Sequence, residues 1–260
     1  MPQDTVYLDR DGPIATIHLN RPNKRNALDS GMWARLIDLV DAAEADPAAK
    51  VIVVTGEGGT FAAGSDIEEL GRSLDDPAVS ERAGDITYRA QMRLRRAAKP
   101  TIAKIRGACV GGGCGIALCC DLRFADTSAQ FGITPGKLGL IYSVADTKRL
   151  VDVVGQARAK DILYTGRVFG AAEALDYGLI DWLAEPKDLD KAVADYTAQI
   201  CDASQVSARA NKEIIHAILD GLADDTPRTR RLFVDGFKGA DFKEGHAAFM
   251  AKRKPVFKST

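Results

Sequence analysis

Cysteine, histidine and aromatic residues are scarce in this sequence. Among 260 residues there are five cysteines and three histidines, and aromatic side chains make up 7%. Four cysteines lie among glycine and alanine between positions 109 and 120, which is typical of buried thiols rather than of disulfides. Cys119 and Cys120 are adjacent, so these thiolates do not converge on one point as a zinc site requires. We therefore expect no metal site, and reduced thiols fit a cytoplasmic protein.

Long apolar runs and an excess of one charge are also missing. No apolar stretch is long enough to span a bilayer, and the N-terminus lacks a basic start followed by an apolar run. We therefore predict no membrane span and no signal peptide. The 35 Lys and Arg residues balance 36 Asp and Glu residues, giving a net charge of -1. This balance argues against nucleic acid and anionic membranes as partners.

Several common catalytic motifs are absent. Neither of the two glycine-bearing turns matches GxGxxG or GxxxxGK[ST], and no Ser or Cys lies in a GxSxG motif. His18 falls in a predicted strand, whereas His216 and His246 fall in predicted C-terminal helices. The histidines therefore offer no catalytic triad, and the motifs do not support nucleotide binding.

What is present predicts a packed α/β core followed by helices. Hydrophobic residues make up 46% and charged residues 27%, which allows a sizeable core. Period-two and period-3.6 patterns alternate in the first part of the chain. They predict a hairpin at 5–20, strands at 51–56 and 101–107, and helices from Ser30, from near Asp66, over 78–98 and over 112–120.

The second part of the chain is mainly helical in pattern. Helices are expected at 144–154, 156–165, 171–177, 187–202, 206–220, 226–238 and 242–253. Strand–helix units followed by helices indicate an α/β core with a helical appendage. We place the core at 1–200 and the C-terminal helical region at 201–260.

Two glycine-bearing turns, 56–66 and 107–115, each lead from a strand into a helix. Because their side chains are absent or small, the backbone there can approach a ligand closely. The helix that begins near Gly112 adds unpaired N–H groups and the positive end of a dipole. For a single turn of this kind, tight packing of helix on strand is the more common explanation. Two such turns facing each other would supply two N–H donors to one carbonyl oxygen.

The spaced motifs along residues 5–255 resemble those of the crotonase (enoyl-CoA hydratase/isomerase) superfamily. The segments that carry the resemblance are Asn20-Arg21-Pro22, Asn26-Ala27-Leu28, 61–67 (FAAGSDI), 111–114 (GGGC), 120–123 (CDLR), Phe131-Gly132, Leu138-Gly139, 147–150 (TKRL), 171–174 (AAEA), Gly178-Leu179 and 252–255 (KRKP). Many motifs in one order are far more specific than one glycine turn.

This resemblance implies a fold and a substrate class. Members fold as a spiral of ββα units, and their C-terminal helices build trimers that often pair into hexamers. They bind acyl-CoA thioesters, so coenzyme A arrives as part of the substrate and no separate cofactor is expected. By motif position, the N–H groups of Ser65 and Gly112 form the oxyanion hole that stabilises an enolate.

The same resemblance implies contacts to coenzyme A. The turn Ala62-Ala63-Gly64-Ser65-Asp66-Ile67 is similar to the segment that contacts the adenine. Candidate partners for the phosphates are Asn23, Lys24, Arg25, Lys252 and Arg253. For each of these charged residues taken singly, solvated surface charge is an equally good interpretation.

The sequence departs from the family where a hydratase places its two glutamates. Those positions are Gly115 and Pro135, and neither residue can move a proton. A third position, an aspartate in some isomerases, falls at or near Ser143. Hydration by paired glutamates is therefore disfavoured, and isomerisation with one base also lacks its usual group.

Other acids near the glycine turns have structural interpretations. Asp66 is expected to cap a helix, Glu68 and Glu69 to face solvent, and Asp146 to favour a helix N-terminus.

Two alternatives to an atypical hydratase or isomerase remain. The loop 133–143 resembles that of methylmalonyl-CoA decarboxylase, in which a tyrosine stands at the position of Tyr142, although Ser65 and Gly115 differ from that enzyme. Decarboxylation needs no base, because loss of carbon dioxide produces the enolate directly. The second alternative is a protein that binds CoA thioesters without catalysis.

Overall fold

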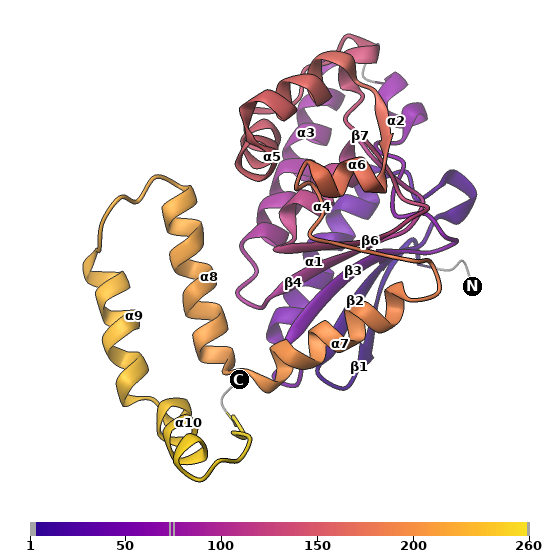
Figure 1. Cartoon of the computed structure of the whole chain (residues 1–260). Coiled ribbons are helices and arrows are strands. Elements are labelled where there is room, and N and C mark those ends of the chain that lie inside the picture. The colour runs from indigo at the N-terminus through magenta and orange to yellow at the C-terminus, as the bar shows by residue number, and fades with distance from the viewer. Residues whose placement is uncertain (1–3, 73, 75, 259–260) are drawn as a thin grey trace.

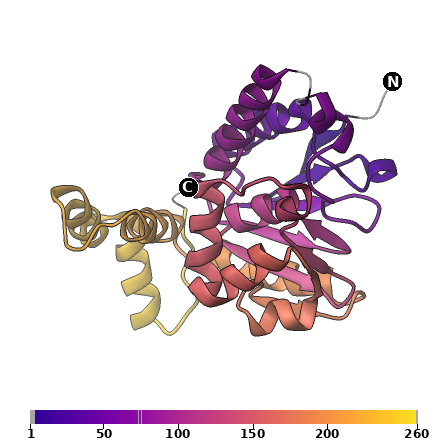
Figure 2. The same cartoon turned by 90° about the horizontal axis from the view of Figure 1, so that it is seen from above.

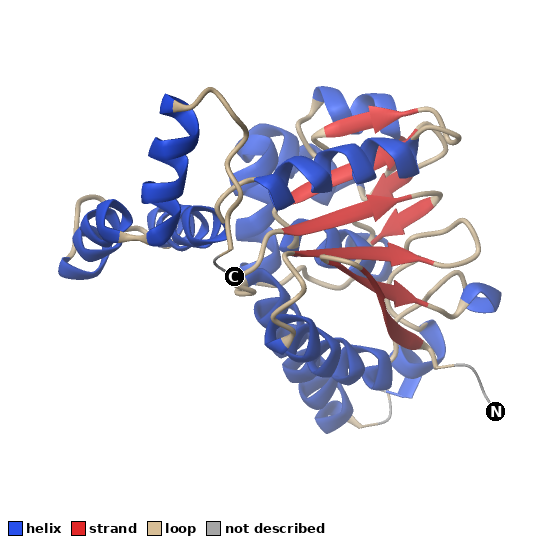
Figure 3. Cartoon of the chain, turned by 90° about the horizontal axis from the view of Figure 1, so that it is seen from below, coloured by secondary structure: helices blue, strands red, loops and turns tan. Residues whose placement is uncertain are grey.

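Two sheets organise the computed structural model, which describes residues 4–72, 74 and 76–258 (Figure 1). The larger sheet has six strands in the order β1, β2, β3, β4, β6, β9, and the smaller has three in the order β5, β7, β8. The strands are β1 Val6–Asp11, β2 Ile14–Leu19, β3 Val51–Gly56, β4 Thr101–Ile105, β5 Ala108–Val110, β6 Leu122–Asp126, β7 Gln130–Gly132, β8 Val168–Gly170 and β9 Trp182–Ala184. The strands β1 and β2 form the predicted hairpin, and the other neighbours in the larger sheet are parallel (Figure 3).

The helices follow the sequence pattern closely, with two short 3₁₀ turns at Pro22–Lys24 and Pro135–Leu138. They are α1 Ser30–Ala45, α2 Ile67–Arg72, α3 Pro77–Arg95, α4 Gly112–Cys119, α5 Val144–Thr165, α6 Ala171–Asp176, α7 Leu189–Asp202, α8 Gln205–Leu219, α9 Pro227–Lys238 and α10 Ala240–Met250. Side-chain caps begin several of them: Asp29 accepts a hydrogen bond from the N–H of Met32, and Ser143 accepts one from the N–H of Asp146.

The chain alternates between the two sheets as it advances. The strands β4 and β5 lead into α4, and β6 and β7 lead towards α5, so each unit places one strand in each sheet. Ala62 extends the smaller sheet because it forms a bridge with Cys109 of β5. This repeating strand–strand–helix unit is the expected ββα spiral, and the prediction of the fold class is confirmed.

The larger sheet buries apolar side chains on both faces. In β3, Ile52 and Val54 join the main core, while Val51 and Val53 belong to a second cluster with Leu189 of α7. This alternation follows from the two-residue period of a strand. The helix α1 packs on β1 and β2, and α7 crosses the sheet in contact with β3, β6 and β9 (Figure 1).

Four details differ from the sequence prediction. The expected helices 144–154 and 156–165 are one helix, α5, which bends at Gly155, where φ is 74°. The expected strand 101–107 ends at Ile105, and β5 follows it as a separate strand. The strands β8 and β9 were not predicted, because three-residue strands are too short for a period to show.

The helices α8, α9 and α10 extend away from the two-sheet body as a C-terminal arm (Figures 1 and 2). Lys212 ties α8 to the body, since its Nζ lies 2.7 Å from a carboxylate oxygen of Asp121 and 2.9 Å from the carbonyl oxygen of Lys99. The boundary at residue 200 stays a prediction, as does the role of the arm in assembly. None of the helices in the described ranges combines the length and apolarity that crossing a membrane requires.

Candidate active site

A cavity of about 1060 Å³ lies between the two glycine-bearing turns, helix α3 and the loop that leads into α5. The helix α3 presents one stripe to it at helical spacing: Ser80, Ala83, Gly84, Thr87, Tyr88 and Gln91. Of the predicted site residues, Ser65, Asp66, Ile67, Gly112 and Tyr142 line the cavity. Two segments that are distant in sequence therefore meet at one concave site, as the two-turn hypothesis expected.

The two turns are in direct backbone contact and form what we call the backbone floor, residues 62–65 and 110–113. The N–H of Val110 donates to the carbonyl oxygen of Ala62 at 2.9 Å. At Gly64, φ is 105°, and a Cβ there would lie 3.2 Å from the carbonyl oxygen of Val110 and 3.7 Å from the nitrogen of Gly112. A Cβ on Gly113 would lie 2.3 Å from the carbonyl oxygen of Ala62, so this position admits only glycine.

The N–H groups of Ser65 and Gly112 have no acceptor among the residues that the structure describes. Gly112 is the first residue of α4, where an N–H has no partner within the helix. The helix dipole adds positive charge at the same place. The backbone floor thus presents two free donors to the cavity, while its neighbouring glycine, Gly113, serves packing.

The predicted coenzyme A segment is continuous in space with the charged residues before it. The N–H of Ala63 donates to the carbonyl oxygen of Arg25 at 2.9 Å, and Lys24 lies 3.7 Å from Asp66. Lys24 also pairs with the exposed Glu68 at 2.6 Å. Among the described residues, Lys24, Arg25, Ala62, Ala63 and Gly64 do not line the cavity itself. They lie beside it.

Asp66 is buried at the start of α2. It accepts hydrogen bonds from the N–H groups of Glu68 at 2.9 Å and Glu69 at 3.4 Å, so the predicted cap is present. Its carboxylate also lies 2.7 Å from the guanidinium of Arg21. Burial raises the pKa of Asp66, but the hydrogen bonds from Arg21 and from the two backbone N–H groups outweigh it and leave the pKa lowered.

Lys252 and Arg253 lie beyond α10 on the C-terminal arm. Arg253 pairs with Glu244 at 2.6 Å. Within the described ranges, every residue that lines the cavity falls between positions 28 and 148. The structure therefore does not bring these two cations to the cavity of their own chain.

The positions at which the family carries glutamates, Gly115 and Pro135, both lie at this site. Pro135 lines the cavity. A Cβ on Gly115 would lie 2.5 Å from Nε2 of Gln91 and 3.4 Å from Oδ1 of Asp146. Side chains from α3 and α5 therefore fill the space into which a side chain at position 115 would project.

These side chains belong to a buried network that we call the polar wall: Gln91, Tyr142, Ser143, Asp146 and Arg149. Nη2 of Arg149 donates to Oε1 of Gln91 at 2.7 Å and to Oδ1 of Asp146 at 2.5 Å. The hydroxyl of Ser143 donates to Oδ2 of Asp146 at 2.6 Å. Ser143 caps α5, and Asp146 lies in the first turn of this helix as predicted, where its carboxylate contacts both Ser143 and Arg149. Sequence reasoning missed Gln91 and Arg149, although the spacing of Asp146 and Arg149 on one helix was a usable signal.

Tyr142 packs its ring against the core and lines the cavity. Its hydroxyl oxygen is buried and has no hydrogen-bond partner among the described residues. Burial, and after it the negative charge of Asp146, raises the pKa of Tyr142 well above its usual value. The phenol therefore keeps its proton and can donate a hydrogen bond to a ligand.

Glu69 differs from its prediction, because it lines the cavity and does not simply face solvent. Its two carboxylate oxygens accept from the backbone N–H of Ser30 at 2.8 Å and from the hydroxyl of Ser30 at 2.5 Å. In the described ranges, no group of three or more His, Cys, Asp or Glu side chains is placed to hold a metal ion.

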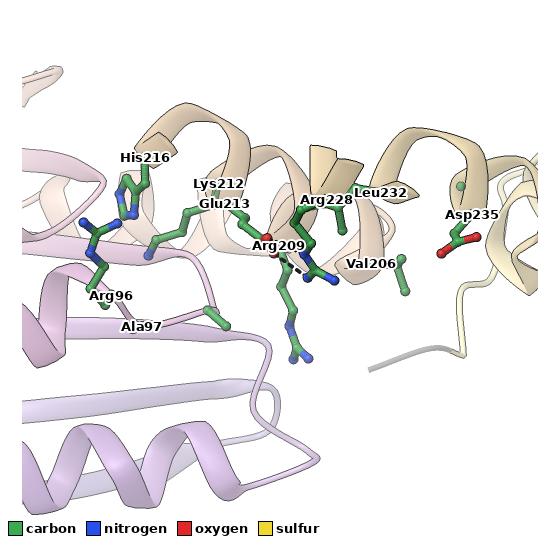
Figure 4. A pocket seen from close by; sticks show the side chains of 13 residues that line it. Arg96, Ala97, Val206, Arg209, Lys212, Glu213, His216, Arg228, Leu232 and Asp235 are labelled. Atoms are coloured by element: carbon green, nitrogen blue, oxygen red, sulfur yellow. Dashed lines mark hydrogen bonds and ion pairs between the residues drawn. The ribbon is translucent and has the colours of Figure 1, made fainter. Parts of the chain in front are cut away.

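A second hollow of about 470 Å³ lies between the end of α3 and the arm helices α8 and α9 (Figure 4). Its cations are mostly paired. Arg228 lies 2.7 Å from Glu213, and Arg96 pairs with Asp220. We assign no ligand to this hollow.

The sequence matches the family described as Enoyl-CoA hydratase/isomerase over residues 9–260. It is 36% identical to a Rhizobium meliloti protein named "Probable enoyl-CoA hydratase", and 33% identical to the crotonyl-CoA hydratase of Syntrophomonas wolfei. Each of these alignments covers 99% of both chains. A crystal structure of an enoyl-CoA hydratase/isomerase family protein from Hyphomonas neptunium superposes with a TM-score of 0.96 at 43% identity, covering 98% of each chain. The chain belongs to the enoyl-CoA hydratase/isomerase (crotonase) family.

Proposed function

We propose that this protein is an enzyme that acts on acyl-CoA thioesters and stabilises a thioester enolate with the N–H groups of Ser65 and Gly112. The observation that carries the proposal is the pair of N–H donors on the backbone floor that have no acceptor among the described residues, beside a cavity of about 1060 Å³. Fixed donors aimed at a developing negative charge favour the transition state over the ground state. Family membership supports the thioester as the substrate class.

In this proposal the thioester carbonyl oxygen lies between the two N–H groups, and the acyl chain extends into the cavity. Apolar side chains with large exposed fractions surround the cavity: Ile67 at 66%, Leu138 at 60%, Ile141 at 95% and Val144 at 87%. A bound acyl chain would cover them and so gain hydrophobic stabilisation. We assign the adenine to residues 62–67 and the phosphates to Lys24 and Arg25.

The reaction that we propose does not use paired glutamates. Positions 115 and 135 carry no titratable side chain, so these two positions cannot supply the two carboxylates of that mechanism. Incubation with crotonyl-CoA, followed by loss of the conjugated absorbance, tests this point. Rapid turnover would contradict it. A panel of CoA thioesters followed by mass spectrometry tests catalysis itself: binding without any product would make the protein a non-catalytic binder.

The oxyanion hole is tested by two substitutions at one position. Gly112→Pro deletes one N–H donor, and we expect at least a roughly hundredfold loss of turnover. Gly112→Ala keeps the donor, and its Cβ would lie 3.4 Å from Trp33 and 3.5 Å from Leu28, which are ordinary contacts. Equal activity in the two variants would show that the N–H of Gly112 is not part of the oxyanion hole.

Decarboxylation is a second candidate, favoured by the buried, protonated hydroxyl of Tyr142, which has no hydrogen-bond partner within the described ranges. Such a donor suits protonation of an enolate that forms when carbon dioxide leaves. Release of carbon dioxide from methylmalonyl-CoA, reduced more strongly than CoA binding in Tyr142→Phe, would support this candidate. No release at high enzyme concentration would remove it.

We also infer that the C-terminal arm mediates assembly into a trimer or a pair of trimers. Aromatic side chains on the arm are exposed in the single chain, among them Phe233 at 69% and Phe249 at 82%. Large exposed apolar groups on one segment favour association. Sedimentation analysis gives the assembly mass, and a monomer at micromolar concentration would contradict the inference.

A further inference from the structure

A carboxylate occupies the space beside Gly115, although the sequence has no acid at that position. The Cβ that Gly115 lacks would lie 3.4 Å from Oδ1 of Asp146. Asp146 comes from the first turn of α5, and Gly115 from the second turn of α4. The packing of α5 on α4 therefore places an acidic group beside position 115, although residue 115 itself is glycine.

This carboxylate lies close to the backbone floor. Gly112 and Gly115 are three residues apart on α4, so they share one face of the helix and are about 4.5 Å apart along its axis. The N–H of Gly112 points out of the N-terminal end of α4, and the Cα–Cβ direction at position 115 tilts toward the same end. The carboxylate of Asp146, which lies beside Gly115, is therefore on the side of α4 from which a carbonyl would approach Gly112.

Asp146 is held firmly but retains capacity to act. Its side chain is 11% exposed and lines the cavity. Arg149 occupies one lone pair of Oδ1, and Ser143 occupies one of Oδ2. Because a carboxylate offers about four acceptor sites, others remain for a proton. Arg149 in turn binds Gln91, which fixes the orientation of the whole group.

The other acidic groups of the cavity are less suitable. Both oxygens of Glu69 bind Ser30 at the start of α1. Asp66 is committed to Arg21 and to the N-terminus of α2. Tyr142 is protonated and cannot accept a proton. Asp146 is thus the acid of the cavity that lies beside Gly115.

We propose that Asp146 is a catalytic residue that removes the proton from the carbon next to the thioester and returns it. This inference rests on the proposed enolate chemistry and adds the base that it lacks. In the step, the C–H bond breaks and its electron pair forms the carbon–carbon double bond of the enolate. The carbonyl π electrons move to the oxygen, which Ser65 and Gly112 hold, and the proton bonds to Asp146. The reverse step restores the thioester and the carboxylate.

Exchange in heavy water tests this step without any need to know the final product. The enzyme and its variants are incubated with butyryl-CoA in D₂O, and deuterium next to the thioester is followed by mass spectrometry. We expect Asp146→Asn to lower the exchange rate at least about a hundredfold, as for loss of a general base. The oxygen of asparagine can still accept from Arg149, and its NH₂ group can donate to the hydroxyl oxygen of Ser143, so the shape of the network can be kept. Fluorescence of Trp33, which lines the cavity, measures butyryl-CoA binding independently.

Two further variants complete the comparison. Asp195→Asn is the matched control, since Asp195 forms an exposed pair with Lys191 on α7, and exchange should stay at the wild-type rate. Glu69→Gln tests the competing acid of the cavity, and its loss should be smaller than that of Asp146→Asn. A larger loss in Glu69→Gln would overturn the proposal.

The outcomes separate this proposal from the one on which it rests. If Asp146→Asn exchanges within threefold of wild type while Gly112→Pro does not exchange, the oxyanion hole stands and Asp146 is not the base. If the wild type binds butyryl-CoA without exchange, the proposed base is wrong. If the wild type does not bind butyryl-CoA at all, both proposals fall.

Discussion

The backbone floor and the polar wall face the same cavity but are built from different groups. The floor consists of main-chain N–H and C=O groups, and its contacts are backbone to backbone, such as the 2.9 Å bond from Val110 to Ala62. The wall consists of side chains from α3 and α5 that bind one another, with Arg149 joining Gln91 to Asp146. One surface is made of main-chain groups from two turns, and the other is made of side chains from two helices.

This difference explains how the glycine-bearing turns can keep the family pattern while the side chains around the cavity differ from it. The floor needs small residues in a fixed order, and any change there moves the main chain itself. The wall needs only that some acidic or polar group reach the space beside Gly115. In our proposal, Asp146 of α5 supplies the carboxylate that α4 lacks at position 115.

The largest effect is expected on the floor. Gly113→Ala would place a Cβ 2.3 Å from the carbonyl oxygen of Ala62, so the backbone has to move. We expect it to lower the free energy of unfolding by about 3 kcal/mol, measured by urea denaturation. Gly84→Ala on α3 is the control, because nothing lies within 4 Å of its added Cβ, and helix propensity should raise stability by about 0.5–1 kcal/mol. A small loss of unfolding free energy in Gly113→Ala would contradict this expectation, because it would show that the backbone floor accommodates the added Cβ.

A smaller effect on the free energy of unfolding is expected at Asp66, where the backbone floor leads into α2. Because the folded pKa of Asp66 is lowered, its ionisation stabilises the fold above the unfolded pKa, about 3.9. That stabilisation is lost as the pH falls through the folded pKa. Asp66→Asn should therefore cost about 2 kcal/mol at pH 7, mainly through the contact with Arg21, and progressively less below pH about 4. Urea denaturation across this pH range measures it, and a difference independent of pH would contradict it.

The smallest effect on the free energy of unfolding is expected in the polar wall, and its size should depend on the side chain of Gln91. Gly115→Ala brings a Cβ to 2.5 Å from Nε2 of Gln91, so the amide has to shift against Arg149, at a cost of about 1 kcal/mol. With Gln91→Ala in place, the same change should be neutral or stabilising, since alanine favours a helix. A double-mutant cycle measures a coupling of about 1 kcal/mol. Additive effects would show that the side chain of Gln91 does not fill this space.

Much of the fold could be predicted from periodicity. The hairpin, β3, the long helices and the α/β core are read from runs of apolar residues, and the helix caps at Asp29 and Asp66 follow from residue type. The strands β8 and β9 escaped prediction because three residues carry no period. The bend at Gly155 escaped it because a glycine in a helical pattern does not reveal its φ angle.

The candidate site divides in the same way. The order of motifs predicted that Ser65 and Gly112 meet, and the structure places both on one cavity. The role of Glu69 was misjudged, because its partner Ser30 is distant in sequence. Gln91 was not considered, because a glutamine on a polar helix looks like surface until the helix packs.

By itself the sequence determined the backbone chemistry of this protein. Small residues at 62–65 and 111–113 let the main chain of each turn approach another group closely, and this depends on residue size and order. Only the tertiary structure decided which side chains complete the cavity. Gln91, Asp146 and Arg149 are brought together by the packing of α3 and α5 on α4. Side-chain contacts between helices depend on where the chain folds back, and no local pattern encodes that.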